Sequence, residues 1–221
     1  EQRLQESSER LAIINTIATN VSTGMNVQQV IAVTLDRLHL RFPEFRLSYC
    51  TISPQGRLKV RDCRLPNHMP DSSGRELDLT TAPAYLQRLQ SQKTLQVSDV
   101  QQDPRLRPLT AAMAEGNTRA ILDVPLTHSE ELVGLLCLDS SDTCFWKQNQ
   151  ILTLQEVAEY LEFAIREAIG QEARARAEQA LEQHKANLEH LVHRRTEQLQ
   201  HQAAFERLIA NLSTQFIRLP A

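Results

Sequence analysis

Apolar residues in the last third of the chain recur at helical spacing. Between Trp146 and Leu219 most residues are Glu, Gln, Arg, Ala and Leu, which are strong helix formers. The only glycine in this stretch is Gly170, and no proline occurs before Pro220. We therefore predict one very long helix, or two helices joined end to end.

This predicted helix carries apolar residues at steps of three and four, the a/d pattern that buries one stripe against a partner helix. The stripe begins with Leu154, Val157, Leu161, Ala164 and Ala168. It weakens into alanines after Gly170 and resumes at Leu181 and Leu188. A jump of four residues to Val192 is a stutter, which locally unwinds a supercoil. A parallel homodimer is the simplest partner, because an intramolecular hairpin would need a turn that the sequence does not supply.

The start of the chain has a similar pattern. Apolar residues lie on one helical stripe at Leu4, Leu11, Ile14, Ala18 and Val21, before Gly24. We expect Leu4 and Leu11 to join the dimer interface. A second helix is expected over residues 27–40, because Pro43 follows it.

The middle of the chain mixes alternating and helical patterns. Strands are expected at residues 46–53, 57–65, 76–79, 94–97, 120–127 and 132–138, and helices at 82–91 and 103–116. The last two strands should form a hairpin around residues 128–131. Runs of adjacent strands predict an α+β fold, in which an antiparallel sheet carries helices on its faces. The long helices at the two ends would flank this fold.

Composition narrows the function classes. The 221 residues are 41% apolar and 23% charged, with a net charge of −3. No basic excess points to nucleic acid, and no apolar run approaches the roughly 20 residues of a membrane span. The polar N-terminus lacks a secretory signal, so we expect a cytoplasmic chain. The four cysteines include no C-x-x-C pair, so we expect reduced thiols and no metal site.

Three segments together resemble the GAF domain family. They are residues 95–105, residues 118–126 with their Pro125-Leu126 pair, and the return strand at 133–138. Phe145-Trp146 and the helix after them match the end of such a domain, so the resemblance covers about residues 10–170. It implies a regulatory module that binds a small molecule between its sheet and the helices inserted mid-domain. It does not imply an enzyme, and no convincingly spaced catalytic set occurs in the sequence.

The tail resembles the connectors of bacterial sensor proteins over residues 188–199, and the opening helix of a second GAF domain over 205–214. Glu9-Arg10-Leu11 recurs there as Glu206-Arg207-Leu208. We therefore expect an N-terminal signalling helix at 1–23, a GAF domain at 24–169, a coiled-coil connector at 170–205 and a truncated second repeat at 206–221. The resemblance implies a downstream output domain in the same chain, in a histidine kinase or a diguanylate cyclase.

Candidate ligand-binding residues follow from strand faces and turns. Tyr49 and Thr51 share a face of the first strand and could offer hydrogen bonds to an apolar pocket. Ile121 and Asp123 share a face of a strongly apolar strand, and that face is either solvent or the ligand cavity. The remaining candidates are Asp99 and Asp103, expected to form a turn and a helix N-cap, Arg105 as a partner for phosphate, and Leu106, Leu109 and Met113 as cavity wall or core.

The ligand itself stays unknown at this stage. In the GAF family a tetrapyrrole is usually attached to a cysteine followed by histidine, and none of the four cysteines precedes histidine. Residues 142–145 match the D-x-C-F pattern of some bilin photoreceptors, but they follow the final strand, so we do not expect a covalent bilin. No Asn-Lys pair of the cyclic-nucleotide signature occurs. The alternative to a ligand sensor is a ligand-free dimerisation scaffold.

Overall fold

The computed structural model describes residues 2–22 and 24–217, with side chains described at 7–8, 10–19 and 24–209. Contacts divide the chain into two units, Glu1–Gln171 and Glu172–Ala221, which are described separately. Leu4, one of the expected interface residues, lies outside the described side chains.

The first unit is built on a six-stranded sheet with the order β3-β2-β1-β6-β5-β4, in which every pair is antiparallel. The strands are β1 (Arg46–Ile52), β2 (Arg57–Arg64), β3 (Glu76–Asp78), β4 (Leu95–Val97), β5 (Ala120–His128) and β6 (Glu131–Ser140). Strands β5 and β6 form the expected hairpin, closed by Ser129 and Glu130, which both have positive φ as a type I′ turn requires. The predicted α+β fold is confirmed.

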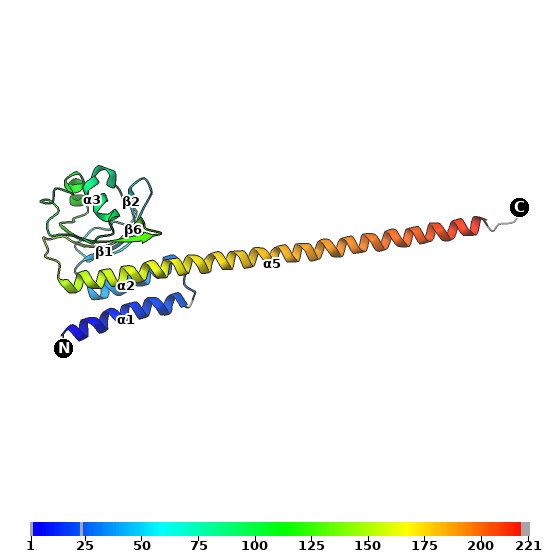
Figure 1. The fold of residues 1–221 in the computed structure, drawn as a ribbon, viewed down its shortest axis with the longest axis horizontal. Coiled ribbons are helices and arrows are strands. Elements are labelled where there is room, and N and C mark those ends of the chain that lie inside the picture. Colours follow the sequence, from blue (N-terminus) through cyan, green and yellow to red (C-terminus); the bar gives the residue numbers. More distant parts are fainter. Residues whose placement is uncertain (1, 23, 218–221) are drawn as a thin grey trace. The chain divides into compact units, whose positions relative to one another are not determined.

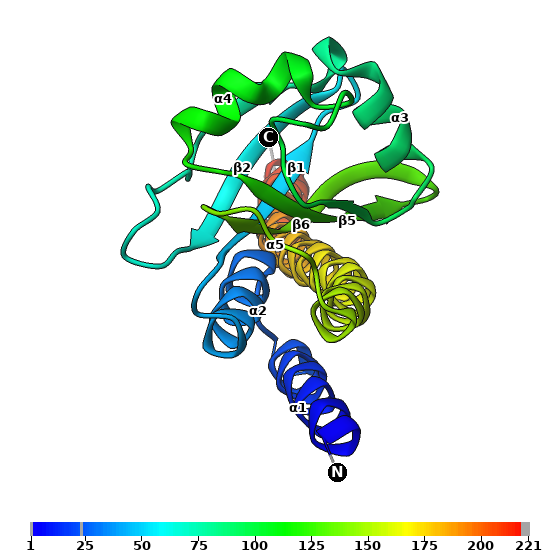
Figure 2. The ribbon, with the colours of Figure 1, turned by 90° about the vertical axis from the view of Figure 1, so that its left-hand side faces the viewer.

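Helices cover both faces of this sheet (Figures 1 and 2). One face carries α2 (Val27–Arg41) and the first part of α5 (Gln148–Ile217), with α1 (Gln2–Ser22) beneath them. The other carries α3 (Pro83–Gln90) and α4 (Thr110–Glu115), with short 3-10 helices at Leu79–Thr81 and Arg107–Leu109. The helix expected over 103–116 begins later than predicted, because Pro108 has no N–H to continue an α-helical ladder.

Each face of the sheet has its own core. Leu122, Val124 and Leu126 of β5 pack with α2 and α5 in a helix-side core. Ile121, Leu135 and Cys137 lie in the opposite core beneath α3. Strand alternation therefore assigns neighbouring residues of β5 to different layers.

The expected dimer seam of α5 is wrong over its first five positions. Leu154, Val157, Leu161, Ala164 and Ala168 are all buried within their own chain. Four of them belong to the helix-side core, where they meet the sheet and α2. Helical periodicity shows that a stripe is buried, but it does not say whether the covering surface belongs to the same chain.

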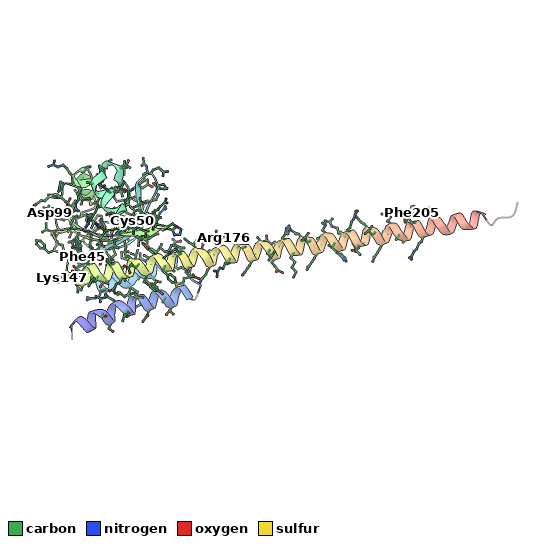
Figure 3. The ribbon with its side chains drawn as sticks, viewed as in Figure 1. Phe45, Cys50, Asp99, Lys147, Arg176 and Phe205 are labelled. Carbon is green, nitrogen blue, oxygen red and sulfur yellow. The ribbon has the colours of Figure 1, made fainter. Side chains whose placement is uncertain are left out.

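The rest of α5 has a different environment. Described side chains from Ala173 onward are exposed, including Leu181 and Leu188, and so is Leu11 of α1. The labelled side chains of Arg176 and Phe205 belong to this part of the helix (Figure 3). The single very long helix is confirmed from Gln148 to Ile217. The expected second repeat, at 206–221, extends outside the described residues. None of the helices in the described ranges is long and apolar enough to cross a membrane.

Candidate ligand cavity

A cavity of about 70 Å³ lies on the sheet face that α3 and α4 cover. Tyr85 of α3 and Met113 of α4 form part of its roof. Its floor comes from four strands and includes Arg46, Ser48, Cys50, Leu58, Val60, Ile121, Asp123, Leu135, Cys137 and Asp139. Cys50, one of these floor residues, is labelled in Figure 3. The room suffices for a few water molecules or a small ligand group.

A polar row crosses the floor of the cavity. Asp123 of β5 is paired in register with Cys137 of β6, and Cys137 is paired with Ser48 of β1. Residues paired across antiparallel strands point to the same face, so the three side chains are neighbours. Three adjacent strands thus place a carboxyl, a thiol and a hydroxyl side by side in an otherwise apolar layer.

Asp123 is the most unusual member of this row, since it is only 2% exposed. The Tyr85 hydroxyl donates a hydrogen bond of 2.7 Å to its Oδ2, and the Cys137 thiol is also hydrogen-bonded to this carboxyl. Burial and the charge of Asp139 raise the pKa of Asp123 from 3.8 to about 7. No described residue forms an ion pair with Asp123. Its charge, when present, is therefore uncompensated.

The neighbours of Asp123 hold their protons. Burial, and then the adjacent Asp123, raise the pKa of the Tyr85 hydroxyl well above its usual value. A hydrogen bond with Cys50, together with burial, raises the pKa of the Cys137 thiol in the same way. Tyr85 and Cys137 are consequently neutral donors near neutral pH.

A buried arginine closes one end of the cavity. The Arg46 guanidinium lies 2.7 Å from Oδ2 of Asp139, and it also donates to the Gly116 carbonyl and to Oγ1 of Thr118. Its charge is thus neutralised by Asp139, and it ties β1 to the segment before β5. The sequence did not predict this pair, because Arg46 begins one predicted strand and Asp139 directly follows another, with nothing in the sequence to show that they meet.

Two hydroxyls in the cavity wall have no partner. The Oγ atoms of Ser48 and Ser72 form no hydrogen bond, although these residues are only 3% and 5% exposed. Buried polar atoms in proteins nearly always have a partner, which can be water or a ligand. Ser48 and Ser72 are therefore the groups of the cavity wall with free hydrogen-bonding capacity.

The structure places some of the predicted ligand-binding residues on the cavity side of the sheet and others away from the cavity. Ile121, Asp123 and Met113 line the cavity, and Leu106 and Leu109 lie in the core on the same side. Tyr49 and Thr51 do not line it. Tyr49 packs against the helix-side core, and the Thr51 hydroxyl accepts a hydrogen bond of 2.8 Å from Arg61. The even-numbered residues of β1 face the cavity instead, because a shift of one position moves a side chain to the other face.

The candidates in the loop before β5 form ion pairs outside the cavity. Arg119 lies 2.8 Å from the carboxylate of Asp99 and lowers the pKa of that carboxyl. Arg105 pairs with Asp103, at 2.5 Å, and lowers the pKa of Asp103 in the same way. Asp103 also accepts a hydrogen bond from the backbone N–H of Arg105, so it caps a turn. The guanidinium of Arg105 is thus engaged by Asp103.

All four cysteines are free thiols. Cys50 and Cys137 line the cavity, whereas Cys144, in the D-x-C-F sequence, packs against the helix-side core. Burial raises the pKa of the Cys144 thiol. Across the described part of the chain, no three His, Cys, Asp or Glu side chains are grouped so that they could hold a metal ion.

An antiparallel sheet with a cavity under mid-domain helices, and long helices on its other face, defines an α+β module with room for a small ligand. The chain belongs to the GAF domain family, whose sequence profile matches residues 9–165. This family consists of sensory modules that bind ligands. No curated protein sequence matches the chain.

Solved structures share the fold at low identity. A phycoerythrobilin-bound GAF domain from a cyanobacterial phytochrome has a TM-score of 0.67 at 15% identity, covering 75% of this chain and 99% of that one. A phycocyanobilin-bound GAF domain, also from a cyanobacterial phytochrome, has a TM-score of 0.64 at 15% identity, covering 72% and 94%. A free methionine-R-sulfoxide reductase from Neisseria meningitidis, in complex with its substrate, has a TM-score of 0.60 at 17% identity, covering 77% and 93%.

These structures correct one expectation. The sequence argument against a covalent bilin is contradicted, because bilin-bound GAF domains are among the structures that this chain resembles in fold. That argument relied on two short attachment patterns, a cysteine followed by histidine and the D-x-C-F sequence, which occurs here only after the final strand. A short motif describes some members of a family, and its absence does not define the cofactors that a fold can accept.

Proposed function

We propose that this chain is the sensory part of a longer cytoplasmic signalling protein of bacterial type. It binds a small ligand in the cavity beneath α3 and α4 and passes the resulting change through α5 to an output domain. The observation that carries the proposal is the cavity itself. Its wall contains two buried hydroxyls without hydrogen-bond partners, those of Ser48 and Ser72, and the buried carboxyl of Asp123, which has no ion-pair partner among the described residues.

Strand β5 provides the physical link between cavity and helix. Asp123 faces the cavity, while its chain neighbours Leu122 and Val124 pack in the same core as Leu154 and Leu161 of α5. A ligand that moves β5 by a fraction of an ångström therefore changes the packing of α5. Packed cores shift between discrete arrangements, so such a movement can alter the rotation or register of the helix.

The connector completes the proposal. We propose that this segment forms a parallel coiled coil with a second copy of the chain. The exposed apolar residues of the second unit, including Leu181 and Leu188, would then pack against the same residues of that copy. A histidine kinase or diguanylate cyclase would follow the connector and the second GAF repeat. The competing function, a ligand-free dimerisation scaffold, would be favoured by a core filled with side chains.

The test is a thermal-shift screen of small polar metabolites on the 221-residue chain. Compounds that raise Tm are measured again on Ser48→Leu, which fills the cavity, and on Ser91→Leu at the exposed end of α3. We expect the shift to be lost in the first variant and kept in the second. Bound compounds should also change hydrogen exchange in residues 148–171. A shift that survives Ser48→Leu would place the ligand elsewhere, and a screen without any stabilising compound would support the scaffold.

A further inference from the structure

The charges around the cavity are unequally compensated. Arg46 is paired with Asp139, and Arg75 donates to the Ala112 carbonyl and to Glu115. Both cations near the cavity thus have partners. Asp123 receives only the neutral donors Tyr85 and Cys137. A ligand that enters the cavity therefore meets one carboxyl that has no counter-ion, whereas both nearby cations already have partners.

The surroundings of Asp123 offer no other charge to balance it. Its partner on β4 is Leu95, and α3 presents Tyr85. Strand β6 presents Cys137 and Asp139, whose negative charge acts against ionisation of Asp123, and β1 adds Cys50 beyond Cys137. Burying an unpaired charge is costly, so any group that brings a positive charge to this point is favoured.

We propose that the ligand of this cavity is a small amine, whose ammonium group donates to the carboxylate of Asp123 and whose second polar group bonds to Ser48 and Ser72. This inference rests on the proposed ligand-binding function and names the ligand class for the same cavity. An ammonium has three donors and no acceptor, which matches a carboxylate that already accepts from one hydroxyl and one thiol.

The spacing of the row limits the length of this amine. Asp123 and Ser48 belong to strands two apart in the sheet, which separates their backbones by roughly 10 Å. Their side chains both point into the cavity, so the two polar groups of the ligand must be a few bonds apart. The cavity volume of about 70 Å³ agrees with such a short molecule.

Binding of an amine should depend on pH with a defined sign. The ammonium prefers ionised Asp123, and the pKa of this carboxyl in the free protein is raised to about 7. Below that pH the ligand must displace a proton from the carboxyl. Affinity should therefore fall by about tenfold for each pH unit below 7 and be constant above it, as long as the amine stays protonated.

The experiment compares three probes of matched length: 4-aminobutan-1-ol, butane-1,4-diol and 4-hydroxybutyrate. Each is titrated into the full chain at about pH 8 and about pH 6, where the amine is protonated, with binding followed by NMR. We expect the amino alcohol to bind at least about tenfold more tightly than the diol at the higher pH, since a charge-assisted hydrogen bond is worth that factor. The hydroxy acid should bind most weakly of the three.

Two variants make the test specific to Asp123. Asp123→Asn should remove the advantage of the amine over the diol, whereas Asp99→Asn, at a carboxyl paired with Arg119 outside the cavity, should leave it unchanged. Equal binding of amine and diol, or tighter binding of the hydroxy acid, would overturn the amine class and leave ligand binding in the cavity intact. An amine preference that persists in Asp123→Asn would also overturn it. If no probe binds, the inference fails and the proposed ligand-binding function is weakened with it.

Discussion

At the scale of single residues, Asp123 shows how much of a buried site the sequence can predict. An acidic residue inside the run Ile121 to Val124 indicates an unusual position, and strand alternation groups it with Ile121. The choice between solvent and cavity depended on what covers that face. Tyr85, which covers it and donates to Asp123, lies 38 residues earlier in the chain. Sequence spacing does not reveal such a contact.

The raised pKa of Asp123 predicts how the free energy of unfolding depends on pH. Between its usual value of 3.8 and about 7, the folded state binds a proton that the unfolded state has released. This contribution to stability is present below about pH 4 and is lost as pH rises through 7. Asp123→Asn removes the charge, so it should stabilise the protein relative to wild type by about 1–4 kcal/mol near pH 8 and much less near pH 5.

Thermal unfolding at several pH values checks this difference. Asp99→Asn is the matched control with the opposite sign, because the Arg119 guanidinium lowers the pKa of Asp99 and its charge is favourable. A difference between wild type and Asp123→Asn that does not grow with pH would contradict the assignment of Asp123 as a buried, titrating carboxyl.

At the scale of elements, the periodicity of α5 predicted a helix and a buried stripe, and both are present. The covering surface was misassigned, since the sheet and α2 take the place of a second copy over residues 154–168. The helix from Asp103 was too long because two prolines lie within it. Local patterns thus fixed the type of each element better than its partners or its ends.

Two glycines provide a prediction at this scale. A Cβ on Gly134 of β6 would lie 2.4 Å from the Cys50 carbonyl oxygen of β1, whereas a Cβ on Gly170 of α5 would meet nothing within 4 Å. Gly134→Ala should destabilise the first unit by about 1–3 kcal/mol through strain between the strands. Gly170→Ala should stabilise the helix by about 0.5–1 kcal/mol, because alanine is the better helix former.

Urea unfolding measures both glycine effects. The fluorescence of Trp146, the single tryptophan, reports on the first unit, and far-UV circular dichroism reports on α5. An unchanged midpoint for Gly134→Ala would mean that β1 and β6 can separate at no cost, against the close approach seen here.

At the scale of the whole molecule, the large apolar side chains that the structure describes in the second unit are exposed. Leu188 is 50% exposed and Leu181 is 70% exposed, and both lie on the helical pattern that predicts a coiled coil. Dimerisation therefore stays a prediction. It now rests on the exposed apolar residues of the second unit, because the apolar stripe at residues 154–168 is buried within its own chain.

Sedimentation of the full chain tests that prediction. We expect a dimer that Leu188→Glu weakens by about 100-fold or more, since a charge at a seam position must be buried without a partner. Leu40→Glu on α2, at a leucine that is 74% exposed in the first unit, should not change the sedimentation coefficient. A monomeric wild type, or equal effects of the two variants, would argue against a coiled coil through Leu188.

The sequence by itself determined the elements, the antiparallel class of the sheet and the family, because these depend on periodicity and on the order of short segments along the chain. It also singled out Asp123 as a residue that its strand does not explain. The tertiary structure decided what each buried stripe packs against, which face of β1 lines the cavity, and that Arg46 meets Asp139. These are contacts between residues distant in sequence, and their free energies depend on burial and on the partner supplied by another element, which no local pattern records.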